Sequence, residues 1–201
     1  MLEEKRKNFK KVQERVGKIF SKIGFSPNQY TLISLFFVFF SFFFLIKKNL
    51  IFAFIFFAAA SLLDFIDGAV AKFLKTETKR GAYLDTICDR YVEGIILFGF
   101  LFLPLKDFIF PAKFWIFLAL FGSLMTTYSK SAAKEKELIK KELKRGFLGR
   151  AERIILILSA IFLGIFDLSL MIYPISVLAI FSNLTVFQRI YFSLKFGENT
   201  F

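Results

Sequence analysis

The sequence predicts an all-α, polytopic membrane protein with six transmembrane helices, preceded by an interfacial amphipathic helix. Hydrophobic residues make up 56% of the 201 positions, and 32 residues are phenylalanine. Long apolar runs alternate with short polar segments that carry most of the lysine and arginine. A chain of this length has room for about six spans with short loops, but not for a separate catalytic domain. We therefore expect a single membrane-embedded domain over residues 1–201.

Residues 3–24 are expected to form the amphipathic helix. Their apolar positions recur at spacings of three and four, and lysine and arginine occupy most of the others. This pattern is typical of a helix that lies along the bilayer surface. Because no apolar core follows the basic start, the segment does not have the pattern of a signal peptide. Gly24 is suited to end this helix, and Pro27 to open the next one.

The apolar runs expected to cross the membrane are 30–46, 51–73, 84–105, 108–128, 154–166 and 168–192. The charged stretch at 134–144 is expected to extend the fourth helix into solvent. Six spans place both termini, the turn at 72–80 and the stretch at 130–153 on one side of the membrane. These segments hold almost all of the lysine and arginine. The positive-inside rule makes that side cytoplasmic, so we expect an integral protein of the cytoplasmic membrane.

Aspartates are concentrated around the junction of the second and third runs. On helices they form two stripes, with Asp64, Asp67 and Gly68 on the first and Gly81, Asp85 and Asp89 on the second. Ionised carboxylates that converge near a membrane repel each other unless cations lie between them. Hard divalent ions prefer oxygen ligands, and two such ions could hold a pyrophosphate. We therefore predict that the four aspartates bind two divalent ions, Mg²⁺ or Mn²⁺. The alternative is an acidic hinge between helices, which would bury carboxylates without purpose.

Residues 64–89 read D-x-x-D-G-x-x-A-K-x8-G-x-x-x-D-x-x-x-D. This pattern resembles the signature of the CDP-alcohol phosphotransferases, integral membrane enzymes that make phospholipid head groups. The departure is Lys72, where the family usually has arginine, and lysine keeps the charge but lacks the bidentate fork. The resemblance implies that Asp89 is the catalytic base and that Gly68, Lys72 and Gly81 lie at the nucleotide.

Residues 26–31, S-P-N-Q-Y-T, resemble the segment that opens the first span in this family. The resemblance implies that Asn28 and Thr31 lie near the nucleotide. Capping of the first transmembrane helix explains the same residues equally well, because serine and proline are favoured at a helix start.

Basic residues stand at the cytoplasmic ends of the fourth, fifth and sixth expected spans. They are Lys130, Arg150, Arg153 and Arg189. Each could simply extend to the membrane edge, or together they could bind the phosphate of a second substrate. Their contexts, Y-x-K, R-x-E-R and Q-R, resemble the branch of the family that transfers inositol phosphate. The resemblance implies that Lys130, Arg153 and Arg189 bind the phosphate of the acceptor, with Arg150 beside them.

The implied function is phospholipid biosynthesis. The phosphatidyl-type group of a CDP-linked lipid, CDP-diacylglycerol or CDP-archaeol, would pass to a hydroxyl of myo-inositol phosphate with release of CMP. Glycerol 3-phosphate as the acceptor, or CDP-inositol reacting with inositol phosphate, are alternatives within the family. The sequence contains no histidine, so a carboxylate is the available general base.

A divalent-cation transporter is the hypothesis from another functional class. It would need acidic residues through the depth of the membrane, and four of the six expected spans have none in their interiors. A non-catalytic scaffold would not need the aspartates. The expected partners are the CDP-linked lipid, a phosphorylated polyol and membrane lipids, with a homodimer left open. Nucleic acid is not expected, because the positive charge gathers at membrane edges.

Overall fold

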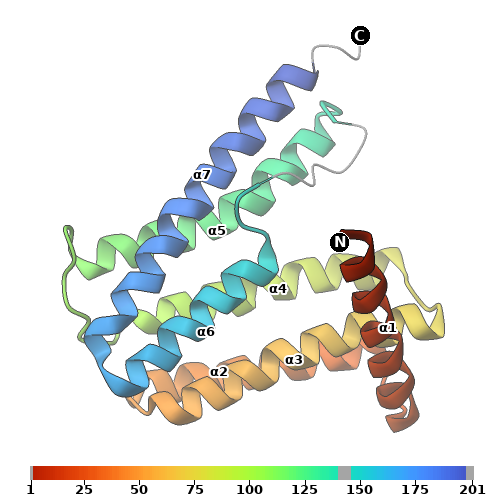
Figure 1. Cartoon of the computed structure of the whole chain (residues 1–201), viewed down its shortest axis with the longest axis horizontal. Helices are drawn as coiled ribbons and strands as arrows, with labels where there is room; N and C mark the ends of the chain where they lie inside the picture. Colours follow the sequence, from red (N-terminus) through yellow and green to blue (C-terminus); the bar gives the residue numbers. More distant parts are fainter. Residues whose placement is uncertain (1, 140–145, 198–201) are drawn as a thin grey trace.

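Residues 2–139 and 146–197 are described by the computed structural model, and this part of the chain is helical (Figure 1). The helices are α1 (Leu2–Phe20), η1 (Ser21–Ile23), α2 (Pro27–Ile46), α3 (Leu50–Leu74), α4 (Lys79–Phe100), α5 (Ala112–Glu135), α6 (Arg150–Phe166), η2 (Leu168–Met171) and α7 (Ile172–Gly197). Within the described residues, Pro27–Ile46, Leu50–Leu74 and Leu168–Lys195 are long and apolar enough to cross a membrane. The prediction of an all-α protein with apolar, membrane-type helices is confirmed.

The long helices pack around one apolar core. α2 packs against α3 and α4, α6 contacts α3 and α7, and α5 lies along α7. Val38, Phe57, Ile96, Phe100 and Ile161 are fully buried at the centre. Figure 1 shows α5 and α7 running together and diverging from α4 towards one end of the molecule.

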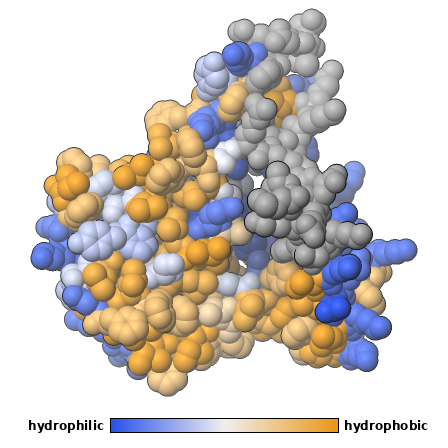
Figure 2. Space-filling model, viewed as in Figure 1, coloured by the Kyte–Doolittle hydropathy of each residue, from blue (hydrophilic) through white to orange (hydrophobic). Residues whose placement is uncertain are grey.

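The outer surface is also strongly apolar. In Figure 2, hydrophobic side chains dominate the visible face over α2, α3 and α6, while hydrophilic ones gather at the end where α1 lies. Phe36, Ile55 and Phe117 are among the large apolar side chains left exposed. A surface of this kind is suited to contact with lipid, because a protein in water rarely exposes such an extended apolar area.

Helix α1 lies across the end of α3 (Figure 1) and contacts it directly. Val16 and Phe20 pack on a small apolar cluster centred on Tyr30. Gly17 faces the backbone of α3, and a Cβ atom there would clash with the carbonyl oxygen of Ala69. Only glycine permits this approach without moving the helix.

Local contacts set the starts of two helices. α4 begins at Lys79 and so contains the predicted stripe of Gly81, Asp85 and Asp89; the Thr78 hydroxyl caps it by accepting a hydrogen bond from the Gly81 amide at 3.0 Å. α5 begins at Ala112 rather than at residue 108, because the Ala112 amide donates to Asp107 Oδ1 at 2.8 Å.

The predicted polar extension of the fourth helix over 134–144 is wrong over residues 136–139. α5 ends at Glu135, and Glu137 takes a left-handed conformation with φ of 56°. Residues 140–145 lie outside the described part of the chain. Residues 136–139 therefore do not continue the helix.

Candidate active site

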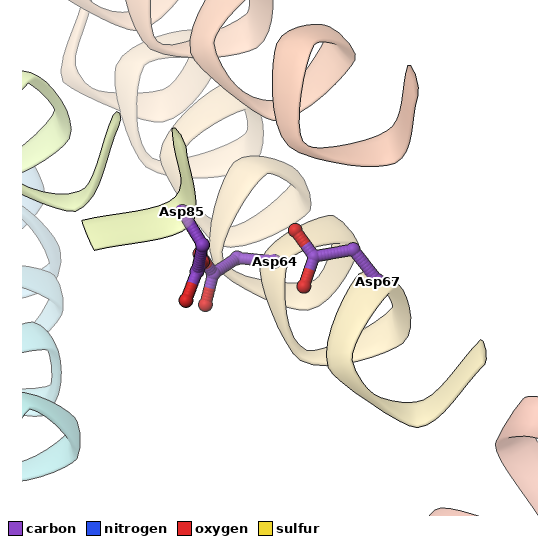
Figure 3. Close-up of side chains that lie close together, drawn as sticks. All are labelled: Asp64, Asp67 and Asp85. Atoms are coloured by element: carbon purple, nitrogen blue, oxygen red, sulfur yellow. The ribbon is translucent and has the colours of Figure 1, made fainter. Parts of the chain in front are cut away.

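Three of the predicted metal ligands point toward one another (Figure 3). Asp64 and Asp67 come from α3 and Asp85 comes from α4, and one carboxylate oxygen of each lies within 4.8 Å of the others. Lys75, in a left-handed conformation with φ of 54°, ends α3 and reverses the chain so that the two stripes meet. A cluster of carboxylate oxygens with this spacing fits a hard divalent cation such as Mg²⁺ or Mn²⁺. The residues present therefore fit the predicted type of ion.

Asp67 is oriented from the first turn of α2. Thr31 Oγ1 donates a hydrogen bond of 2.6 Å to Asp67 Oδ2, and both residues are buried. The turn itself is held by a capping box, in which the Gln29 amide donates to Ser26 Oγ and the Ser26 amide donates to Gln29 Oε1. The capping interpretation of residues 26–31 is confirmed, and the capped helix also brings Thr31 to Asp67.

A cavity of about 660 Å³ opens beside Asp67 and Asp85. Its lining brings together the five residues predicted for the nucleotide, which are Asn28, Thr31, Gly68, Lys72 and Gly81. The volume lies in the range of small-molecule and cofactor sites. A Cβ atom at Gly68 would meet nothing within 4 Å, so this glycine leaves the cavity floor open to a ligand.

Lys72, the departure from the family pattern, is exposed at the edge of this cavity. Its Nζ donates a hydrogen bond of 3.2 Å to Oε1 of Gln13, which lies on α1. The N-terminal helix thus contacts Lys72, a cation that lines the side of the cavity formed by α3.

Asp89 lies apart from the group of three. Its Oδ1 forms an ion pair of 2.5 Å with Arg150 Nη2, and its Oδ2 accepts a hydrogen bond of 3.0 Å from Arg90 Nη1. Arg150 also donates to both oxygens of Asp64, at 2.7 and 2.6 Å. The guanidinium predicted to lie near the acceptor therefore bridges two of the four aspartates.

Arg153 and Arg189 meet at one residue of α5. Arg153 is 2% exposed, and its Nε and Nη2 donate to the two oxygens of Glu93, both at 2.9 Å. Its Nη1 donates to Thr126 Oγ1 at 3.1 Å, and Arg189 Nη1 donates to the carbonyl oxygen of Thr126. The Nε of Arg189 is buried without a hydrogen-bond partner among the described residues. Lys130 lies on the same helix, one turn after Thr126, and is half-buried.

Sequence reasoning missed Glu93, Arg90 and Thr126. Glu93 could have been identified from the sequence, because it continues the stripe of Asp85 and Asp89 at the same spacing of four. Nothing in the spacing of apolar and polar residues distinguished Thr126 from its neighbours. Arg90 followed an aspartate, but its bonds to Thr127 on α5 depend on how α4 and α5 pack.

Comparison with known proteins gives the family. The model of the CDP-alcohol phosphatidyltransferase family matches residues 25–187. The chain is 33% identical over 197 residues to an archaetidylinositol phosphate synthase from Pyrococcus horikoshii, and the match covers 97% of each chain.

Solved structures of a phosphatidylinositol phosphate synthase from Mycobacterium tuberculosis share the fold. The complex with manganese and citrate matches with a TM-score of 0.77 at 23% identity, covering 90% of this chain and 88% of the other. The form with CDP-DAG bound matches with a TM-score of 0.76 at 22% identity, covering 91% and 94%.

The resemblance carried by residues 64–89 is thereby confirmed over most of the chain. An aspartate cluster suited to divalent ions lies beside a cavity of nucleotide size, within membrane-type helices. The chain belongs to the CDP-alcohol phosphatidyltransferase family of membrane-bound enzymes, which transfer substituted phosphate groups in phospholipid biosynthesis.

Proposed function

We propose that this protein transfers the phosphatidyl-type group of CDP-diacylglycerol or CDP-archaeol to myo-inositol phosphate and releases CMP. The proposal depends on one observation: the acidic aspartate cluster lies next to the basic site formed by the arginines of α6 and α7. Arg150 joins the two, because it lies on α6 and binds Asp64 and Asp89. The full-length match to an archaetidylinositol phosphate synthase supports the acceptor. CDP-DAG in the solved neighbour supports the donor.

The nucleotide would occupy the cavity between the starts of α2 and α4 and the end of α3. Asn28, Thr31, Gly68, Lys72 and Gly81 would line it there. Lys72 would contact a phosphate as a point charge, since its ammonium group cannot form the paired hydrogen bonds of a guanidinium. Gln13 would hold Lys72 at the cavity in the absence of substrate.

Asp64, Asp67, Asp85 and Asp89 would hold two divalent ions, Mg²⁺ or Mn²⁺. The carboxylate cluster supports this, as does the manganese in the solved neighbour. When bound, the ions would neutralise the pyrophosphate and the charge that develops on the departing CMP. Thr31 would keep Asp67 turned toward the cluster.

In the reaction, a hydroxyl oxygen of the acceptor would form a bond to the β-phosphorus of the CDP-lipid. The bond from that phosphorus to the bridging oxygen would break, and CMP would leave. Asp89 would receive the hydroxyl proton, because the chain contains no histidine. Positioning and electrostatic stabilisation would supply most of the acceleration.

The acceptor phosphate would bind among Lys130, Arg150, Arg153 and Arg189. Arg189 has a buried Nε with no partner in the described part of the chain, so it can donate to a phosphate oxygen. Arg153 is more deeply buried than Arg150 and already donates a hydrogen bond to Glu93. We therefore propose that it forms the buried wall of the phosphate site. Guanidinium groups suit a phosphate because they form two parallel hydrogen bonds.

In the membrane, the six long helices α2 to α7 would all cross, with α1 on the surface. α4, α5 and α6 have 22, 24 and 17 residues. At about 1.5 Å per residue they reach roughly 33, 36 and 26 Å, close to a hydrocarbon core of about 30 Å. The active site would face the cytoplasm, and residues 1–201 would act as one domain. Val12 and Ile19 are exposed on α1 and would enter the bilayer surface.

The test is a CMP-release assay on purified protein with Mg²⁺ or Mn²⁺ present. CDP-archaeol, CDP-diacylglycerol and CDP-inositol are compared as donors, each with myo-inositol phosphate, glycerol 3-phosphate, inositol and serine. We expect release with inositol phosphate to exceed release with the unphosphorylated acceptors by about 100-fold, as a site built for a charged group rejects ligands that lack it. Preference for glycerol 3-phosphate, or activity only with CDP-inositol, would replace the proposed acceptor or donor.

A further inference from the structure

Glu93 is an acidic residue inside the apolar part of α4. Its side chain is 1% exposed, and each of its oxygens accepts a hydrogen bond of 2.9 Å from Arg153. A buried ion pair of this kind gives little net stability, because desolvating two charges offsets their attraction. Well-packed apolar side chains would hold α4 against α6 at least as well. The pair therefore calls for a role other than stability.

The contacts of Arg153 indicate such a role. Its third nitrogen donates to the hydroxyl of Thr126, and the carbonyl oxygen of Thr126 accepts from Arg189. One continuous chain of hydrogen bonds thus runs from Glu93 on α4 through Arg153 on α6 and Thr126 on α5 to Arg189 on α7. Arg189 is the residue whose buried Nε has no partner among the described residues.

The charges of the two arginines explain why an acidic residue, Glu93, stands at one end of this series of hydrogen bonds. Arg153 and Arg189 bind the same residue, so two guanidinium groups lie close together in a site of low polarity. Without a nearby carboxylate, their repulsion would push the side chains apart before any phosphate arrived. Glu93 offsets the charge of Arg153, and its bidentate bond fixes the plane of that guanidinium.

We propose that Glu93 is a positioning residue for the acceptor. It holds Arg153 and, through Thr126, keeps Arg189 in place to bind the acceptor. This inference rests on the proposed function for the chemical class of the acceptor, a phosphate monoester. It predicts that loss of Glu93 weakens acceptor binding and leaves the CDP-lipid end of the site intact.

The test uses the full-length protein and compares Glu93→Gln with wild type. The variant keeps the shape of the side chain but removes its charge and one of its two acceptor oxygens. We expect KM for the acceptor that wild type prefers to rise about tenfold or more, the size typical of truncating one partner of a buried charge pair. KM for the CDP-lipid should stay within about twofold of the wild-type value, because the aspartates that serve that substrate keep their contacts.

Glu152→Gln is the matched control. Glu152 lies next to Arg153 in the sequence, but it is exposed, so its loss should leave both KM values unchanged. An unchanged acceptor KM in Glu93→Gln, or an equal rise for both substrates, would overturn the inference. The acceptor panel on wild type tests the proposed function separately, since the KM comparison uses whichever acceptor wild type prefers.

A second variant guards against failure of Glu93→Gln to fold. Glu93→Gln with Arg153→Gln leaves a neutral pair of amides that can bond each other, and its melting temperature should approach that of wild type. A wild-type acceptor KM in this double variant would overturn the inference. We expect its acceptor KM to remain raised, because nothing then positions Arg189.

Discussion

Arg150 binds two aspartates that lie on different helices. It donates to both oxygens of Asp64 and forms an ion pair with Asp89. The guanidinium of Arg150 therefore neutralises part of the negative charge of the aspartates. Among the described residues, no ion pair involves Asp67 or Asp85. These two carboxylates, which also line the cavity, are the ones that most need a divalent ion.

The residue-scale prediction follows from Asp85. Asp85→Asn replaces a carboxylate of the cluster by a neutral amide, so the affinity for Mn²⁺ should fall by about 10- to 100-fold, since ligand charge sets the affinity of oxygen sites. The free Mn²⁺ signal in electron paramagnetic resonance measures this in purified protein without any turnover. Glu135→Gln, an exposed acid at the end of α5, should bind Mn²⁺ as wild type does. Wild-type affinity in Asp85→Asn would remove Asp85 from the ion site.

Helix α1 contacts residues that line the cavity of the candidate active site. It supplies Gln13 to Lys72, and the carbonyl oxygen of Phe20 accepts a hydrogen bond of 3.0 Å from the hydroxyl of Tyr30. Ser21, in the η1 turn that follows, lines the cavity. Gly17, between Gln13 and Phe20 on α1, lies directly against the backbone of α3.

The element-scale prediction is that Gly17→Ala loosens this helix. A Cβ atom at residue 17 would clash with the carbonyl oxygen of Ala69 and would lie 2.7 Å from Cβ of Phe73. Overpacking of this kind costs about 1–3 kcal/mol, so the undocked state of α1 should become about tenfold more populated. Tryptic cleavage after the lysines of α1 should accelerate by that factor, and KM for the CDP-lipid should rise.

Gly94→Ala is the control for this experiment. It is also a glycine-to-alanine change within a helix, but the new methyl group would meet only Leu120, at an ordinary 3.8 Å. Its cleavage rate should match that of wild type. Equal rates in all three proteins would show that α1 does not depend on the contact at Gly17.

For the whole molecule, charge is distributed unequally between the two ends of the helices. α1, the turn after α3 and the segments that flank 140–145 lie at one end and are rich in lysine and arginine. The connections at 47–49 and 101–111 lie at the other end and hold Lys47, Lys48 and Lys106. This asymmetry supports the proposed cytoplasmic orientation of the site.

Cysteine labelling in intact cells tests that orientation. In a Cys88→Ser background, Glu137→Cys should react only after the membrane is opened, and Lys106→Cys should react with an impermeant reagent from outside. Both positions are exposed and lie at opposite ends of α5. The reverse pattern would invert the topology and place the aspartates on the outer side.

Much of the site could be predicted from local spacing. Asp64 and Asp67 share a stripe of α3, as their spacing predicted, and the five residues that the family resemblance placed at the nucleotide line one cavity. The start of α5 could not be predicted from apolar periodicity, because it coincides with a single hydrogen bond from the Ala112 amide to Asp107. Asp89 was grouped with the other acids because spacing alone does not show which cation it faces.

The sequence by itself determined the all-helical membrane architecture, the aspartate stripes and the family, because apolar periodicity and residue spacing along one helix are local properties. Only the tertiary structure decided the partners of the arginines. Arg150 reaches an aspartate 86 residues away, and Arg153 reaches a glutamate 60 residues away. These pairings depend on where α6 packs against α3 and beside α4, and no period within a single helix encodes that placement.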